Sequence, residues 1–519
     1  MKLKSMNVLD AGLLLMESPQ TPMHIGGIQV LKLPRGAGPD FVHKLRQRMM
    51  GFAADGAPFN YRLTRSGGGL GMPVWEVLDA VNLDQHVFHH ALPYPGGERE
   101  LLELISRLNS DALDRSRPLW EATVIEGLDH IEFLPRGSFA ILLKVHYAAV
   151  DGLAALQALE RLHDTAPHAV HEAASEPRAD DGQLPASEML ARAGMHALGT
   201  PLRWGRLVGN LVPALGRMAA AVREQRAGHS PAAVNTRFNG RVSSYRVIES
   251  TFFSLAELKA VRAAVPHSTL NDVVVSVIGG AMRRYLQSRG ELGEVSPVTI
   301  APLSVREAEA RELGGNLASA MAIPLHTTIE DPLERLAAVQ RDAAGAGKIA
   351  QALGPHNALD LIEAVPSQLA SLGFLEFGMR LLLATGIAVP VNTVITSVPG
   401  PQRPLYLAGA RLVTMAGFGP VMDSMGLFHA VMSYDGKVSI AINSCREMMP
   451  DPAFYAECIV ASFEELREAA KTRRPGGTPT QRAPGRARKA AGRAREPARA
   501  VRARAKPKAA VRRAARRRD

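Results

Sequence analysis

The segment 139–152, FAILLKVHYAAVDG, joins a strand pattern to the start of a helix. From Phe139 to Tyr147 every second side chain is large and apolar, and this period of two predicts a β-strand. Asp151 then stands at a position typical of a helix N-cap, and leucines recur behind it at helical spacing. The pattern therefore predicts a strand that carries His146 to its carboxyl end, just before an Asp-Gly entry into a helix.

Hydrophobic period and turn residues predict further elements on both sides of this segment. A strand beginning at Trp120 is expected to pair beside the Phe139 strand, and Asp435-Gly436 is expected to close a hairpin between apolar strands. Helices are predicted over 98–113, from Thr269 onward, and after Asp451-Pro452 to about Ala470.

The length of the chain and its linker-like stretch predict how it is divided. At 519 residues the chain exceeds what one hydrophobic core usually supports, so two domains are expected. A polar, Ala- and Pro-containing stretch after residue 165 predicts a linker, followed by a helix whose apolar stripe is bordered by arginines. Two interpretations of that helix remain open, namely contact with a lipid surface and packing across the other domain. The predicted organisation is a domain at 1–165, the linker with its helix at 166–234, a second domain at 235–470 and a tail at 471–519.

The net charge of +11 is unevenly distributed along the chain. Residues 471–519 hold 19 Lys and Arg against 2 acidic residues, so the rest of the chain carries a net charge of −6. A basic tail without a periodic apolar face cannot bury enough surface to fold, and it is expected to be disordered. Two interpretations remain: the tail binds an anionic surface such as lipid by charge, or it is a solubilising tail with no dedicated partner. Nucleic acid is not expected as the main partner, because the excess of basic residues is confined to the tail.

Cysteine content and apolar runs bear on the cellular location. The two cysteines, Cys445 and Cys458, suit a reducing cytoplasm. Acidic residues in or near the first apolar run disfavour a signal peptide, and prolines interrupt the apolar run 381–400. We therefore expect a cytoplasmic protein, with peripheral attachment to the inner membrane or to lipid droplets as an alternative. The histidines at 86, 89 and 90 are interpreted as surface or packing residues, and no metal is expected.

The segment His146 to Gly152, HYAAVDG, resembles the HHxxxDG motif of the acyl-CoA-dependent acyltransferases related to chloramphenicol acetyltransferase. More closely, the chain resembles the bacterial wax ester synthase/diacylglycerol acyltransferase family. Its beginning is similar to that of the family, with an acidic residue at Glu17 and the segment Pro22 to Gly26, PMHIG. Further blocks follow in the family's order and end near Ala470: LDRxRPLW with Pro118, Leu119 and Trp120; NDVV with Asn271 and Asp272; PxSVR with Arg306; GN with Asn316; and SNVPGP with Ser397.

The resemblance implies an α/β fold of two chloramphenicol-acetyltransferase-like domains, each a mixed sheet with helices, and an active-site tunnel at their junction. It implies transfer of a long-chain acyl group from acyl-CoA to diacylglycerol or a long-chain alcohol, without a cofactor. In the family the second His of the motif is the general base and the Asp, here Asp151, holds the loop in place. Pro118, Leu119, Trp120, Asn271, Asp272, Arg306, Asn316 and Ser397 would then lie in or near the site. As alternatives, Trp120 is only a core residue, and Asn271 or Thr269 caps the helix that begins there.

Tyr147 stands where the family has its general-base histidine. A phenol with an ordinary pKa of about 10 is a poor base at neutral pH, whereas imidazole is well suited. Three alternatives remain: an acyltransferase in which His146 or a residue such as His429 is the base, a catalytically impaired paralogue that binds acyl chains or a partner, and an acyltransferase whose acceptor is acidic enough to need no strong base. Because neighbouring strand residues point to opposite faces, His146 and Tyr147 are not expected to face the same side.

Overall fold

The computed structural model describes residues 2–150, 158–168, 234–302, 320–353 and 391–472, apart from short gaps at 7, 35, 39–40, 55–57, 66–72 and 159. The predicted amphipathic helix of the 166–234 stretch and the basic tail beyond Thr472 lie outside the described residues. Within residues 1–473 the described elements form one compact unit, which holds two larger β-sheets and a small third sheet.

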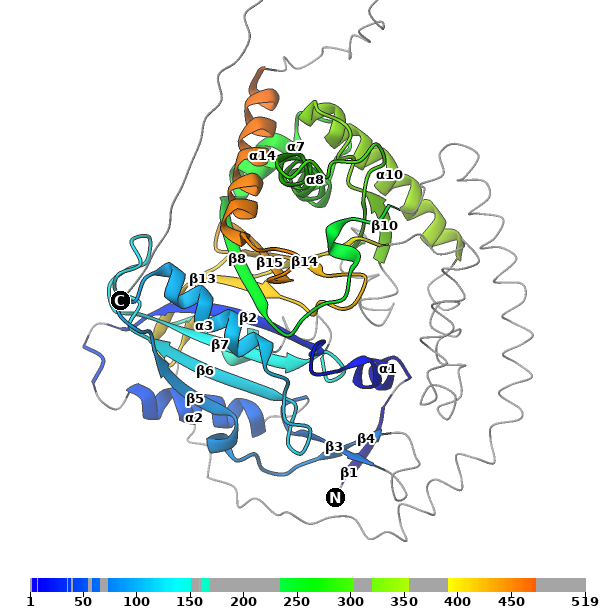
Figure 1. Ribbon diagram of the computed structural model, residues 1–519. Coiled ribbons are helices and arrows are strands. Elements are labelled where there is room, and N and C mark those ends of the chain that lie inside the picture. Colours follow the sequence, from blue (N-terminus) through cyan, green and yellow to red (C-terminus); the bar gives the residue numbers. More distant parts are fainter. Residues whose placement is uncertain are drawn as a thin grey trace, which may run out of the picture. The chain divides into compact units, whose positions relative to one another are not determined.

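The first large sheet is built around the segment that the sequence singled out, in the spatial order β12-β13-β2-β7-β6-β5. Figure 1 shows its strands β13, β2, β7, β6 and β5. Its strands are β2 (His24–Lys32), β5 (Val87–Ala91), β6 (Trp120–Glu126), β7 (Ser138–His146), β12 (Tyr406–Leu407) and β13 (Ala410–Phe418). The predicted strand ending at His146 is confirmed, and so is the neighbouring strand beginning at Trp120, which runs antiparallel to it. Both faces of β7 are covered, because α3 (Glu98–Ser110) packs on one face and α2 (Phe41–Ala54) on the other. This double burial explains why nearly the whole strand is apolar.

Two strands of the first sheet come from the far end of the chain. β13 pairs antiparallel with β2, placing Phe418 opposite Gly26, and β12 pairs with β13 at the sheet edge. A side chain at Gly26 would overlap the ring of Phe418, so the glycine permits this pairing. Residues 406–418, which the sequence groups with the second half, therefore complete the sheet that carries His146.

The second large sheet has the spatial order β10-β9-β11-β14-β15-β8. Its strands are β8 (Arg246–Ser254), β9 (Val298–Pro302), β10 (Ala320–Pro324), β11 (Thr393–Pro399), β14 (Leu427–Tyr434) and β15 (Lys437–Cys445). Helices α7 (Leu255–Arg262), α8 (Leu270–Ser288), α10 (Pro332–Leu353) and α14 (Pro452–Thr472) lie against it (Figure 1). The predicted hairpin at Asp435-Gly436 joins β14 to β15, and the predicted closing helix is α14.

The remaining elements are short. The small sheet has the order β1-β4-β3, with β1 (Lys2–Ser5), β3 (Tyr61–Arg65) and β4 (Pro73–Val77), and α1 (Val8–Met16) follows β1. Single 3₁₀ turns occur at η1 (Leu83–Gln85) and η2 (Arg237–Asn239). No helix in the described part of the chain is both long enough and apolar enough to cross a membrane.

Helix α3 also ties the first sheet to the edge of the second. The amide of Ile248 donates to Ser106 Oγ at 3.0 Å, and the amide of Arg246 donates to Ser110 Oγ at 3.2 Å. Residues 246 and 248 are two apart on the edge strand β8, so their N–H groups point the same way, out of the sheet. The two serines therefore satisfy edge donors that would otherwise stay exposed.

Candidate active site

His146 is the last residue of β7 and is completely buried. Its amide donates to the carbonyl of Leu119 at 2.9 Å, so the PLW block lies directly against the first residue of the motif. On its other side β7 pairs with β2, and His24 stands opposite His146. The end of β7 is thus held between two neighbouring strands before the chain turns at Tyr147.

Both ring nitrogens of His146 face groups of the protein. Nδ1 accepts a hydrogen bond from the amide of Ala148 at 3.0 Å, which requires Nδ1 to be unprotonated. The neutral ring then carries its proton on Nε2, which lies 3.5 Å from Oε1 of Glu17, longer than a good hydrogen bond. Neither nitrogen of this buried ring offers a lone pair to a substrate hydroxyl.

The carboxylate of Glu17 connects several groups around this segment. Oε2 accepts bonds from Nε of Arg115 at 2.8 Å and from its Nη2 at 2.6 Å, and Oε1 accepts from the amide of Met23 at 3.1 Å. Burial raises the pKa of Glu17, but interactions with His146, the Met23 amide and Arg115 outweigh it and lower the pKa to about 2. Glu17 is therefore ionised at every pH at which the protein would work.

The lowered pKa of Glu17 predicts a loss of stability in acid. A carboxyl with a folded pKa of about 2 and an ordinary value of 4.5 stabilises the fold above pH 4.5 and loses this effect as the pH falls towards 2. At about 1.4 kcal/mol per pKa unit the effect is about 3 kcal/mol. Urea titrations of the parent and of Glu17→Gln should differ by about this amount at pH 6 and converge only as the pH approaches 2. A difference that stays constant over this range would contradict the prediction.

Tyr147 follows His146 and is half-buried. Its amide donates to the carbonyl of Met23 at 2.8 Å, and the amide of Ala149 donates to the carbonyl of His146 at 2.9 Å, which closes a turn. Asp151 and Gly152 lie outside the described residues, as do Arg306 and Asn316. The described part of the motif therefore consists of His146, Tyr147 and the turn that follows.

Trp120 is a core residue that packs next to this segment. Its indole Nε1 donates to the carbonyl of Phe59 at 2.8 Å, and its ring stacks on His86 with a centroid distance of 4.5 Å. Nδ1 of His86 in turn lies 2.8 Å from the Trp120 carbonyl. Pro118 and Leu119 precede the strand in a tight turn, with the Trp120 amide donating to the Pro118 carbonyl at 2.8 Å.

The NDVV and SNVPGP blocks meet in the second half of the chain. Asp272 and Thr269 form a reciprocal capping box at the start of α8, with the Thr269 amide donating to Asp272 Oδ2 at 2.7 Å. Asn271 instead accepts a bond from the hydroxyl of Ser397 on β11 at 2.9 Å. Asp272 thus serves the helix, and Asn271 joins α8 to the strand that carries Ser397.

His429 is buried in the core of the second half rather than exposed to a substrate. Its Nε2 lies 2.9 Å from the hydroxyl of Tyr455, its Nδ1 lies 3.0 Å from Thr393 Oγ1, and the ring has no exposed surface. Burial lowers the pKa of His429 to about 3. The alternative that His429 replaces the missing base is therefore wrong, because the sheet directs this ring into the helices α8 and α14.

Replacing His429 is expected to change stability and not catalysis. In His429→Leu the buried hydroxyl of Tyr455 loses its partner, and we expect a loss of about 1–3 kcal/mol in the free energy of unfolding. Urea titration measures the loss, and release of free CoA from acyl-CoA measures turnover. A folded variant without turnover would show that His429 takes part in the reaction after all.

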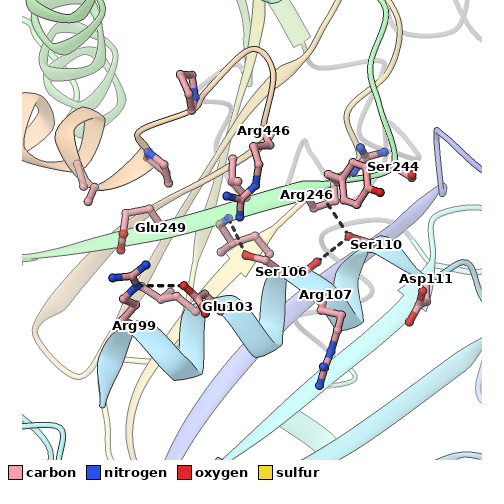
Figure 2. Close-up of a pocket in the computed structure, with 18 of the residues that line it drawn as sticks. Arg99, Glu103, Ser106, Arg107, Ser110, Asp111, Ser244, Arg246, Glu249 and Arg446 are labelled. Carbon is pink, nitrogen blue, oxygen red and sulfur yellow. Dashed lines mark hydrogen bonds and ion pairs between the residues drawn. The ribbon is translucent and has the colours of Figure 1, made fainter. Parts of the chain in front are cut away.

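A cleft of about 2050 Å³ extends from Glu17 and Arg115 along α3 to α14, with β8 between them. Figure 2 shows the side chains of Arg99 and Glu103 on α3 and of Arg246 and Glu249 on β8. Burial raises the pKa of Glu249 to about 7, and the charge of Glu98 adds to this effect. The α14 side supplies small and apolar residues, namely Pro452, Ala453, Ala456, Val460 and Ala461. The cleft is larger than the 300–1,000 Å³ typical of ligand pockets, and it combines apolar and charged walls.

Comparison with known protein families shows which family this chain belongs to. Residues 6–274 match the model of the wax ester synthase/diacylglycerol acyltransferase catalytic domain. The chain belongs to this family. Residues 314–467 match the family's C-terminal domain as well, and the two matches lie in the expected order.

Individual relatives agree with the family over nearly the whole chain. A protein of Mycobacterium tuberculosis described as a probable diacylglycerol O-acyltransferase is 31% identical over 89% of this chain and 98% of its own length. The wax ester synthase/diacylglycerol acyltransferase of Marinobacter aquaeolei superposes with a TM-score of 0.63 at 27% identity, covering 90% of this chain and all of that one. The first condensation domain of the calcium-dependent antibiotic synthetase shares the fold, with a TM-score of 0.52 at 14% identity and coverage of 91% and 97%.

The network around Glu17 is the part of the site that sequence reasoning did not assemble. Glu17 and Arg115 both stand in blocks that resemble the family, but 98 positions separate them along the chain. Spacing gives no sign that they pair. The only signal available was that two charged residues of opposite sign occur in blocks expected near one site.

Proposed function

We propose that this member of the family is an acyl-CoA-dependent O-acyltransferase that moves a long-chain acyl group to diacylglycerol or a long-chain alcohol. The observation that supports this most is the backbone bond between His146, the first residue of the HYAAVDG motif, and Leu119 of the PLW block, in a chain of this family. The cleft whose lining includes Glu17, but neither His146 nor Tyr147, is large enough for a long-chain substrate. The names of the relatives cited above support the choice of acceptor.

In the proposed reaction the acceptor hydroxyl oxygen attacks the thioester carbonyl of acyl-CoA. The new C–O bond forms, the C–S bond breaks, and the hydroxyl proton passes through a base to the departing thiolate, giving an ester and free CoA. Tyr147 occupies the position of that base, and a phenol with an ordinary pKa of about 10 accepts a proton only weakly at neutral pH. His146 is assigned a positioning role instead, because its ring is buried and Nδ1 already accepts the Ala148 amide.

The proposal is tested by measuring CoA release from palmitoyl-CoA by the purified full-length chain. Dioleoylglycerol and hexadecanol serve as acceptors, and mixtures without acceptor correct for simple hydrolysis. Acceptor-dependent CoA release together with formation of the ester would support the proposal. A parent chain that is silent with both acceptors, combined with turnover in Tyr147→His, would instead favour the impaired paralogue that binds acyl chains.

We also propose peripheral attachment to a lipid surface, because the acceptor is dissolved in lipid. The basic residues of 471–519 support this, since each Lys or Arg near an anionic membrane contributes about 1 kcal/mol. The full-length chain is expected to sediment with vesicles of phosphatidylglycerol and phosphatidylcholine, and a chain ending at Thr472 is expected to stay in the supernatant. Equal sedimentation of both chains would contradict a role for the tail.

A further inference from the structure

We infer that Glu17, anchored by Arg115, is a positioning residue that fixes the imidazole of His146 and the backbone of Met23, and through them the backbone at Tyr147. This inference rests on the proposed function, since it concerns the geometry of the same site. The contacts of Glu17 that support it are features of the structure and hold whether or not the proposed function is right.

The His146 ring is oriented by the groups that face its two nitrogens. The Ala148 amide occupies Nδ1, so the ring proton of the neutral form sits on Nε2, and among the described side chains Nε2 faces the carboxylate of Glu17. A buried N–H without an acceptor costs free energy, and a nearby carboxylate reduces that cost. Glu17 therefore favours the tautomer that keeps the Ala148 bond, which shapes the turn after Tyr147.

Glu17 also bonds the residue that precedes the neighbouring strand β2. Oε1 of Glu17 accepts the amide of Met23, and the carbonyl of Met23 accepts the amide of Tyr147. One carboxylate oxygen thus accepts the amide of the residue that precedes β2 and lies 3.5 Å from Nε2 of His146 on β7. It holds Tyr147 from both sides, through the ring of His146 and through the peptide of Met23.

Arg115 keeps the carboxylate of Glu17 in place. Arg115 donates two bonds to Oε2 and a further bond from Nη2 to the carbonyl of Leu14 at 2.7 Å. The side chain of Glu17 is 6% exposed and that of Arg115 is 39% exposed. The pair therefore joins the end of α1 to the LDRSRPLW segment and leaves the carboxylate little freedom to rotate.

The chain offers a matched ion pair elsewhere. Glu76 on β4 is 4% exposed and accepts two bonds from Arg62 on β3, at 3.1 and 3.0 Å. Its burial and its pairing with arginine match those of Glu17, but its carboxylate bonds join the strands β3 and β4 of the small sheet. Loss of Glu76 reports the cost of breaking such a pair in the small sheet, which reaches the turn after Tyr147 through the apolar cluster of Trp75, Leu119 and Ala148 and not through the carboxylate.

The test compares Glu17→Gln with Glu76→Gln in the full-length chain, each in the parent and in Tyr147→His. We expect both to lower the free energy of unfolding, but only Glu17→Gln to lower kcat, by about 10-fold to 10²-fold, with KM changed less than about twofold. Glu17→Asp should recover part of the loss. A folded Glu17→Gln whose kcat stays within twofold of its parent would overturn the inference.

A second readout separates this inference from the proposed function. In histidine-labelled protein, ¹⁵N NMR should show His146 protonated on Nε2 in the parent, with its signals assigned by their absence in His146→Gln. Glu17→Gln should shift these signals, and Glu76→Gln should leave them unchanged. Protonation on Nδ1 in the parent overturns the inference whether or not the enzyme turns over. Absence of turnover in both the parent and Tyr147→His, with the expected NMR result, contradicts the proposed function and leaves the positioning geometry standing.

Discussion

Tyr147→His is expected to raise kcat at pH 7 by about 10²–10⁴-fold, the contribution typical of a general base. A phenol has an ordinary pKa of about 10, and with that value almost none of it is ionised at neutral pH. An imidazole with an ordinary pKa of about 6.5 is a much stronger acceptor under the same conditions. CoA release at saturating palmitoyl-CoA and dioleoylglycerol measures the effect.

The pH dependence of the two chains provides the control. Turnover by the parent should keep rising above pH 8, and turnover by Tyr147→His should level off near pH 7. In each chain the rate follows the fraction of the residue at position 147 that is deprotonated. Tyr147→Phe tests the phenol itself, since it keeps the ring and removes the oxygen. If Tyr147→Phe turns over as fast as the parent, the hydroxyl takes no part in proton transfer. If Tyr147→His leaves kcat unchanged, another residue is the base.

Trp120→Ala is expected to lower the free energy of unfolding by about 3–5 kcal/mol. Trp120 is 2% exposed, and its removal leaves a cavity between Phe59 and His86 at the start of β6. It also leaves the buried carbonyl of Phe59 without the indole N–H. Urea titration followed by circular dichroism measures the loss without relying on tryptophan fluorescence.

Trp120→Phe is the matched variant for this site. It keeps a ring to pack against His86 and Phe59 but loses the hydrogen bond, so a smaller loss of about 1–2 kcal/mol is expected. Equal losses in the two variants would show that the hydrogen bond dominates. A loss below 1 kcal/mol in Trp120→Ala would mean that the core around β6 refills the cavity.

Much of the fold was predictable because its signals are local. The period of two up to His146, the Asp435-Gly436 turn and the closing helix each lie within a short window, and each is confirmed. The resemblance of the ordered blocks to a known family was also sufficient to predict the architecture, which the family match confirms. The strand, the turn and the helix are predicted from periodicity and turn chemistry, which a single sequence carries.

The prediction that failed and the contacts that were not predicted all depend on residues that are distant along the chain. His429 was a candidate base because its block departs from the family, but the alternation of β14 directs its ring into the core, where Tyr455 holds it. The ion pair of Glu17 with Arg115 and the pairing of β13 with β2 leave no trace in local spacing. Sequence reasoning did identify His146 and Tyr147 as the residues at the end of this strand, but not the carboxylate that lies against His146.

The pairing of β13 with β2 has a consequence for synthesis on the ribosome. When residues 24–146 have emerged, β2 and β7 can already pair, but the other edge of β2 has no partner until residues 410–418 follow. At about 5–20 residues per second this interval lasts tens of seconds. During that time an apolar strand edge is open to pairing with other nascent chains. Chaperone dependence and aggregation should therefore be concentrated in the period before the last hundred residues are translated.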